Sequence, residues 1–170
     1  MLLAARASAP ALRKIAEDQT APPIQRIIAL GRLPGRAIKA APPETLAVFV
    51  ESGEEDGMDT IAVYADGTVK FIDAAGEVSH LAATRLATKK KVAELMSLGQ
   101  QLSARIEAWP QARLAPPIRN MVRLTFIATN GYYFGQGPIR MLAKDESGGP
   151  IIRQAAAILS DIIMGETKKI

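Results

Sequence analysis

The chain has 170 residues and a formal net charge of +4, and this length is typical of one domain with its own hydrophobic core. The absence of cysteine excludes disulfide bonds, thiolate metal sites and a cysteine nucleophile. The charge alternates along the chain, from +5 over residues 1–43 to −8 over 44–83, +6 over 84–123 and +1 over 124–170, which is unlike the continuous basic face of a nucleic-acid-binding protein.

Residues 1–43 are predicted to form an N-terminal helical arm and a Pro/Gly-rich linker, because they contain six of the eleven prolines. A short helix is expected around residues 12–16, with Ser8 as its cap. A second helix is expected to start at Pro22 and Pro23 and to end at Gly31. The linker then covers residues 33–43.

The second helix of the arm carries Ile24, Ile27 and Ile28 on one face. A contiguous group of isoleucines is costly to leave in water. We therefore expect this face to dock on the body of the protein or on a second subunit, which makes the three isoleucines candidate binding residues.

Residues 44–170 are predicted to form a single α+β domain that opens with an antiparallel meander. Residues 46–50 are apolar on both faces, as expected of a strand in the middle of a sheet. Asp66 and Gly67 separate two β-prone runs within residues 60–72, and this pair predicts a tight hairpin turn. A second turn at residues 73–76 leads to a fourth strand over residues 77–81.

The rest of the domain is predicted to contain a long helix, a second hairpin and a terminal helix. The helical pattern runs from about Thr84 to Trp109 and is stopped by Pro110. Asn130 and Gly131 predict the turn of the second hairpin within residues 122–134. A short helical turn over residues 137–142 precedes the last helix, whose apolar stripe runs over 151–163 with Gly165 as its C-terminal cap.

This order predicts an α+β fold, in which a long central helix and a C-terminal helix pack on an antiparallel sheet made of the meander plus the hairpin. The order of elements is similar to the layout of small dimerisation modules of the roadblock or profilin-like kind. That similarity is one of layout, and layout alone does not carry function.

Three groups of polar residues are candidates for chemistry, and each has a plainer interpretation. His80 is the only histidine, and no nucleophile or acid is marked as its partner, so we expect a structural role. The acidic run does not have the spacing of a calcium loop, so we expect it to face water and to hold no metal; it contains Glu51, Glu54, Glu55, Asp56 and Asp59. A third, basic group could contact phosphates, but no glycine-rich phosphate loop accompanies it. It contains Arg85, Lys89, Lys90, Lys91, Arg113, Arg119 and Arg123.

Aromatic residues gather beside glycines just after the second turn, at Tyr132, Tyr133 and Phe134. On a strand Tyr132 and Phe134 face one way and Tyr133 faces the other. One of the rings is therefore expected to lie in the core and one on the outer face, where an exposed ring anchors a partner. Cross-strand packing is the alternative interpretation of all three.

We expect a protein that acts by binding, as a homodimer or with a protein partner, and without a cofactor or catalysis. The candidate binding residues are Tyr132, Tyr133, Phe134, Ile24, Ile27 and Ile28. An alternative is a small-ligand enzyme or sensor with a pocket between the long helix and the sheet, into which Tyr64, His80 or Tyr132 points. A second alternative is a nucleic-acid accessory protein.

The sequence also predicts a soluble, cytoplasmic protein. Arg6 interrupts the first apolar stretch and no basic residue precedes it, which is unlike an export signal. The most apolar window, residues 151–164, contains Arg153 and Asp161 and falls short of the ~20 uncharged residues that span a bilayer.

Overall fold

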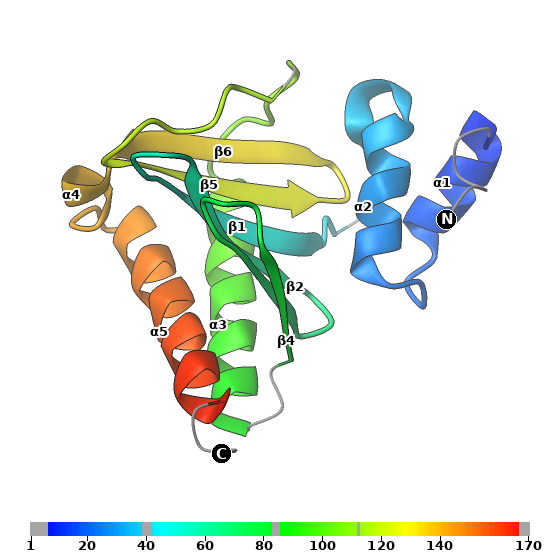
Figure 1. Cartoon of the computed structure of the whole chain (residues 1–170). Helices are drawn as coiled ribbons and strands as arrows, with labels where there is room; N and C mark the ends of the chain where they lie inside the picture. The colour runs from blue at the N-terminus through cyan, green and yellow to red at the C-terminus, as the bar shows by residue number, and fades with distance from the viewer. Residues whose placement is uncertain (1–6, 39–41, 83–85, 112, 167–170) are drawn as a thin grey trace.

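The computed structural model describes residues 7–38, 42–82, 86–111 and 113–166. Within these ranges the chain forms one six-stranded antiparallel sheet with helices on both sides, which confirms the predicted α+β fold (Figure 1). No helix of the described ranges has both the length and the apolar character needed to cross a bilayer.

The sheet has the strand order β4-β3-β2-β1-β5-β6. Its central strand β1 pairs antiparallel with β2 on one side and with β5 on the other, so it joins the predicted meander to the predicted hairpin. The strands are β1 (Thr45–Gly53), β2 (Met58–Tyr64), β3 (Thr68–Ile72), β4 (Val78–Ala82), β5 (Met121–Ala128) and β6 (Gly131–Pro138).

Both predicted hairpin turns are present. Between β2 and β3, the Gly67 N–H donates to the Tyr64 carbonyl at 3.0 Å. Gly67 has a positive φ of 87°, a conformation that would be strained for a residue with a side chain. Asp66 stays outside the left-handed region and instead accepts a hydrogen bond from the Thr68 N–H at 2.9 Å. Gly131 opens β6 in the second turn.

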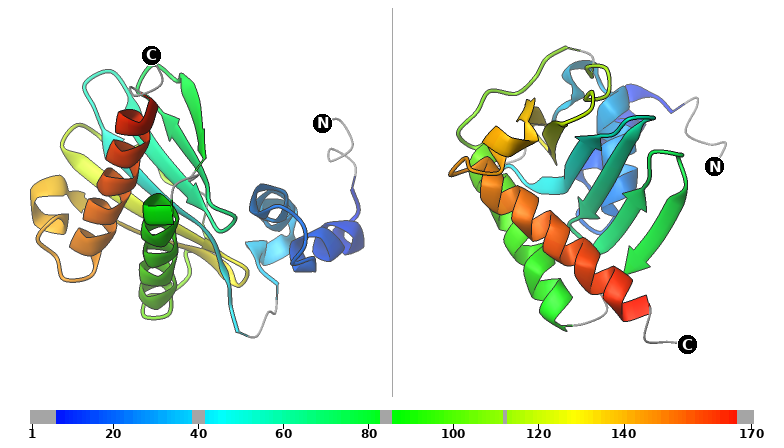
Figure 2. Two further views of the ribbon diagram at one scale, coloured as in Figure 1. Left: turned by 90° about the horizontal axis from the view of Figure 1, so that it is seen from below. Right: turned by 60° about the vertical axis from the view of Figure 1, so that its left-hand side comes forward.

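The main core lies between one face of the sheet and two helices, α3 (Leu86–Ser103) and α5 (Gly148–Glu166), which lie side by side in Figure 2. Gly99 lets α3 approach the sheet closely, because a Cβ there would lie 2.7 Å from Val48 Cγ2. The short helix α4 (Ile139–Leu142) forms the predicted turn before α5. Fully buried members of this core include Val48, Val69, Leu95, Phe126, Ile151 and Ile158.

The long helix ends at Ser103, so the prediction that it continues to Trp109 is wrong. The backbone N–H of Trp109 donates at 2.6 Å to the carbonyl of Tyr132 in the edge strand β6. A hydrogen bond to an edge strand satisfies a carbonyl that has no strand partner, and this tertiary contact overrides the helical periodicity. The predicted start at Thr84 lies outside the described residues.

The arm packs on the opposite face of the sheet, as the right view of Figure 2 shows. Its helices are α1 (Ala9–Glu17) and α2 (Pro23–Arg32), followed by the 3-10 turn η2 (Pro34–Arg36). Leu30 and Leu33 of the arm pack with Leu46 of β1. The arm therefore buries its leucines against its own chain.

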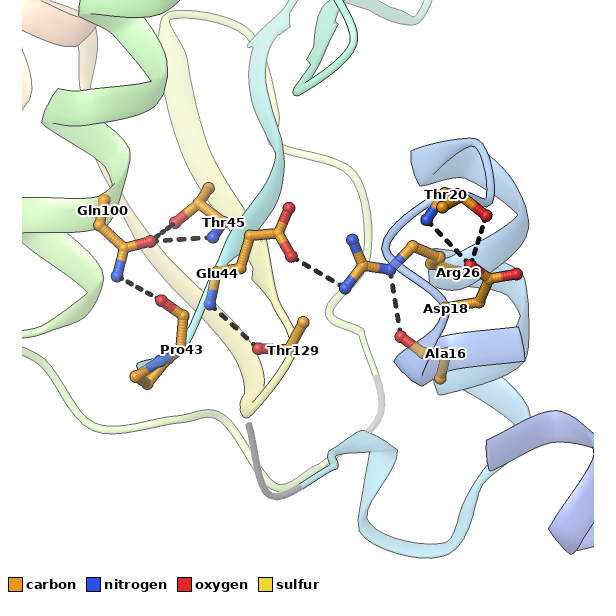
Figure 3. A network of polar contacts seen from close by, with 9 residues as sticks. All are labelled: Ala16, Asp18, Thr20, Arg26, Pro43, Glu44, Thr45, Gln100 and Thr129. Atoms are coloured by element: carbon orange, nitrogen blue, oxygen red, sulfur yellow. Dashed lines mark hydrogen bonds and ion pairs between the residues drawn. The ribbon is translucent and has the colours of Figure 1, made fainter. Parts of the chain in front are cut away.

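A polar network also holds the arm against the sheet (Figure 3). Arg26 is 3% exposed; its Nε donates to the Ala16 carbonyl at 3.1 Å and its Nη2 lies 2.9 Å from Glu44 Oε2. The Glu44 N–H in turn donates to Thr129 Oγ1 at 3.0 Å. Because Thr129 directly follows β5, Arg26 connects both arm helices to the centre of the sheet.

Candidate functional site

A cavity of about 210 Å³ lies on the arm side of the sheet, opposite α3 and α5. Its wall contains segments that are distant in sequence: the end of α2, η2, strands β1, β5 and β6, and the segment that follows α3. The described lining residues are Gly31, Arg36, Phe49, Trp109, Gln111, Arg113, Leu114, Arg123, Thr125, Ile127, Tyr132, Tyr133 and Phe134.

The sheet supplies the floor of the cavity. Phe49, Thr125 and Phe134 form one row across three strands, because Phe49 pairs with Thr125 and Thr125 pairs with Phe134. In the next row Ile127 pairs with Tyr132. Side chains alternate between the faces of a strand, so these residues face the arm while their neighbours face the core.

The segment after α3 covers part of this floor. The Trp109 ring packs edge-to-face on Phe134, with ring centroids 4.8 Å apart. Farther along, the chain crosses β1 at Gly53, where a Cβ would collide with the carbonyl groups of Pro117 and Ile118. Glycine is required there because the two backbones approach so closely.

A buried carboxylate lies beside the cavity. Glu51 of β1 is fully buried, and its Oε2 accepts hydrogen bonds from Arg123 Nε at 2.7 Å and from Thr125 Oγ1 at 3.1 Å. Its Oε1 forms an ion pair with Arg113 Nη2. A buried charge is tolerated only when it is paired in this way.

Arg123 joins the covering segment to the sheet. Besides its contacts with Glu51, its Nη1 donates to the carbonyls of Leu114 at 3.2 Å and Ala115 at 3.0 Å. The side chain is 2% exposed, so its donors are satisfied inside the protein. Burial lowers the pKa of the Arg123 guanidinium from its ordinary value.

Arg113 differs from Arg123 in its exposure, since 58% of its side chain is accessible to solvent. Burial of the remainder lowers the pKa of the Arg113 guanidinium, and the positive charge of Arg123 lowers it further. Three arginines border the cavity: Arg36, Arg113 and Arg123. Glu51 is the carboxylate that pairs with Arg113 and Arg123. The site therefore carries excess positive charge.

The arm contributes the third arginine. The Arg36 guanidinium lies over the Tyr132 ring at 5.9 Å from its centroid, which is cation–π geometry. Arg36 has a φ of 50°, an uncommon backbone conformation for a residue with a side chain. Burial raises the pKa of the Tyr132 phenol, and the charge of Arg36 partly offsets that effect. The neutral Tyr132 hydroxyl donates to the Ile27 carbonyl of α2 at 3.4 Å.

The six predicted binding residues do not meet at one site. Tyr132 and Phe134 line the cavity; Tyr133 also borders it, but it is 5% exposed and belongs to the core cluster on the other face. Ile27 is partly buried between the arm and the sheet. Ile24 and Ile28 are 37% and 46% exposed on the outer surface. The sequence therefore separated the faces of β6 correctly but did not show that the covering segment completes the site.

The expectation that the acidic run faces water is wrong for Glu51, because Arg113 and Arg123 compensate its buried charge. It is right for Glu54, Glu55 and Asp56, which are exposed. The charge alternation along the sequence was the available signal. Acidic and basic segments do face each other within one molecule, since Arg26 also pairs with Glu44 and Arg119 with Glu55.

The predicted pocket between the long helix and the sheet corresponds to an open hollow of about 660 Å³ between α3 and the β2–β3 turn. Its described lining includes Lys89 and Met96 of α3 and Asp66 of the turn, but neither Tyr64 nor Tyr132. His80 lies in β4 opposite Lys70, and its side chain lies outside the described part.

Comparison with known proteins gives no relative: no protein-family model, no curated protein and no solved structure matches the chain. The functional argument therefore depends on the geometry of the cavity.

The pairing of Glu51 predicts a large stability loss in Glu51→Gln. The variant leaves the buried Arg123 without its counter-charge, which costs about 3–5 kcal/mol of unfolding free energy. Glu55→Gln is the matched control, because the exposed Glu55–Arg119 pair at 3.5 Å contributes about 0–1 kcal/mol. Urea unfolding measures both variants, and equal losses would contradict the assigned role of Glu51.

Proposed function

We propose that this protein binds a small organic molecule in the cavity between the arm and the sheet, without transforming it. The observation that carries the proposal is the cavity itself, which places the rings of Phe49, Trp109, Tyr132 and Phe134 beside arginines. Binding sites typically combine an apolar, aromatic lining with a few polar groups that orient the ligand.

The volume limits the enclosed part of the ligand to about one ring with a small substituent. An apolar cavity of about 150 Å³ in another protein is large enough to hold benzene. The cavity of this protein, at about 210 Å³, offers moderately more room. A nucleotide or a folded peptide is too large to be enclosed there.

The chemical character of the lining favours binding over catalysis. Aromatic rings and guanidinium groups hold and orient a molecule, while proton transfer needs a group that changes its protonation near neutral pH. The Glu51 carboxylate is occupied by Arg113, Arg123 and Thr125. The absence of a cofactor and a cytoplasmic location remain predictions from the sequence.

A second candidate function is homodimerisation through the arm. It is favoured by the exposure of Ile24 and Ile28, with Ile15 of α1 also 39% exposed. Three isoleucines in water on two neighbouring helices suit an isologous contact with a second copy.

Closing the cavity should abolish binding. In Gly31→Leu the new side chain enters at the cavity wall, because a Cβ at Gly31 lies 3.3 Å from Tyr132 Oη. Gly135→Leu is the matched control, since a Cβ there meets nothing within 4 Å and Gly135 does not line the cavity. Ligand-observed NMR with a set of single-ring fragments should give binders for the wild type and Gly135→Leu, and none for Gly31→Leu. The proposal fails if no fragment binds the wild type, or if Gly31→Leu binds the same fragments.

The second candidate predicts a dimer in multi-angle light scattering of the wild-type protein. Replacement of Ile24 and Ile28 together by Ser should yield a monomer, because it removes the apolar contact. Met141→Ser is the control, since Met141 is 70% exposed on α4 away from the arm, and it should leave the dimer intact. A monomeric wild-type protein excludes this candidate.

A further inference from the structure

We infer that the ligand is an aromatic carboxylate whose anionic group binds Arg113 and whose ring lies among Phe49, Trp109 and Phe134. This inference rests on the proposed binding function and specifies the chemical class of the ligand. It follows from the charge of the site, the donors that are still available, the helix end at the cavity wall and the arrangement of the rings.

The charge of the site calls for an anion. Arg36, Arg113 and Arg123 border the cavity with Glu51 as their described carboxylate partner, which leaves two positive charges in formal excess. The buried Arg123 is screened less than a surface charge, while Arg113 is 58% exposed and is partly screened by solvent. An anionic ligand would compensate this excess directly, whereas a neutral ligand would leave it to solvent.

Arg113 is the arginine with donors to offer. A guanidinium carries five N–H donors in a planar fork. Arg123 uses its donors on Glu51 and on two backbone carbonyls, whereas the described ion pair of Arg113 involves its Nη2. Arg113 lines the cavity and its side chain is 58% exposed in total, so the rest of its fork is accessible to a carboxylate.

The end of α2 favours a carboxylate over a phosphate. Gly31, the penultimate residue of this helix, lines the cavity, so the negative end of the helix dipole borders the site. That partial charge is more unfavourable for a phosphate dianion than for a singly charged carboxylate. The Arg36 guanidinium, which follows the helix and also lines the cavity, opposes that partial charge.

The rings favour an aromatic body. Trp109 meets Phe134 edge-to-face, and Phe49 lies two strands away from Phe134 in the same row of the sheet. Aromatic rings prefer to pack with their centroids about 4.5–7 Å apart, in offset or edge-to-face arrangements. We therefore expect the ring of the ligand to pack against these side chains in offset or edge-to-face geometry.

Binding is expected to redistribute the contacts of Arg113. The ligand carboxylate and Glu51 share this guanidinium, while Glu51 keeps Arg123 and Thr125 as partners. Arg113 is therefore a specificity-determining residue: it selects the anion, and Arg123 preserves the fold.

Isothermal titration calorimetry with benzoate as the probe tests the assignment. Benzoate should bind the wild-type protein roughly tenfold or more tightly than benzamide, its neutral isostere, because charged hydrogen bonds exceed neutral ones by that margin. Benzoate should also bind more tightly than acetate, which lacks the ring, and than phenyl phosphate. Arg113→Gln should lose most of the benzoate affinity, and Arg119→Gln, which changes an exposed arginine outside the cavity, should retain it.

The outcomes separate this inference from the function on which it rests. Equal binding of benzoate and benzamide, tighter binding of acetate or phenyl phosphate, or an unchanged affinity in Arg113→Gln overturns the ligand class while cavity binding stands. If neither benzoate nor any single-ring fragment binds the wild-type protein, the binding function itself is wrong. The comparison of probes on the wild-type protein decides the question even if a variant fails to fold.

Discussion

The burial of one carboxylate, Glu51, constrains the whole arm side of the sheet. A fully buried charge on the central strand requires partners, and Arg123 and Arg113 provide them from the adjacent strand and from the segment after α3. Arg123 also binds two carbonyls of that segment, so the pairing that compensates Glu51 also holds the cover over the sheet. This cover forms one wall of the cavity.

The two faces of the sheet have different roles. One face is filled by α3 and α5 in a continuous apolar core, which fixes the strands. The other face carries both polar and aromatic side chains, and the arm and the segment after α3 cover only part of it. The arm is held by Arg26 and by its leucines, and it brings Gly31 and Arg36 to the cavity wall. Rigidity on one face thus supports a partly open site on the other.

The sequence predicts features that depend on neighbouring residues. The turn at Gly67 and the buried face of α5 from Ile151 to Ile158 were predictable, because turn chemistry and helical periodicity are local. Ile163, at the end of the predicted stripe, is 53% exposed. The site was not, because Glu51 meets Arg123 across 72 residues and no local pattern records such a pairing. Trp109 shows the limit most clearly: its spacing fits the stripe of a helix, yet a hydrogen bond to β6 and a ring contact with Phe134 place it over the opposite face.

The central claim is that the covering segment and the open sheet face form one ligand site, and the single tryptophan reports on it directly. Trp109 gives one indole N–H resonance in a ¹H–¹⁵N spectrum, which is measured during a titration with benzoate. The account predicts that this resonance shifts and reaches saturation together with the backbone amides of Phe134 and Thr125. An indole resonance that stays fixed while benzoate saturates other parts of the spectrum would contradict it.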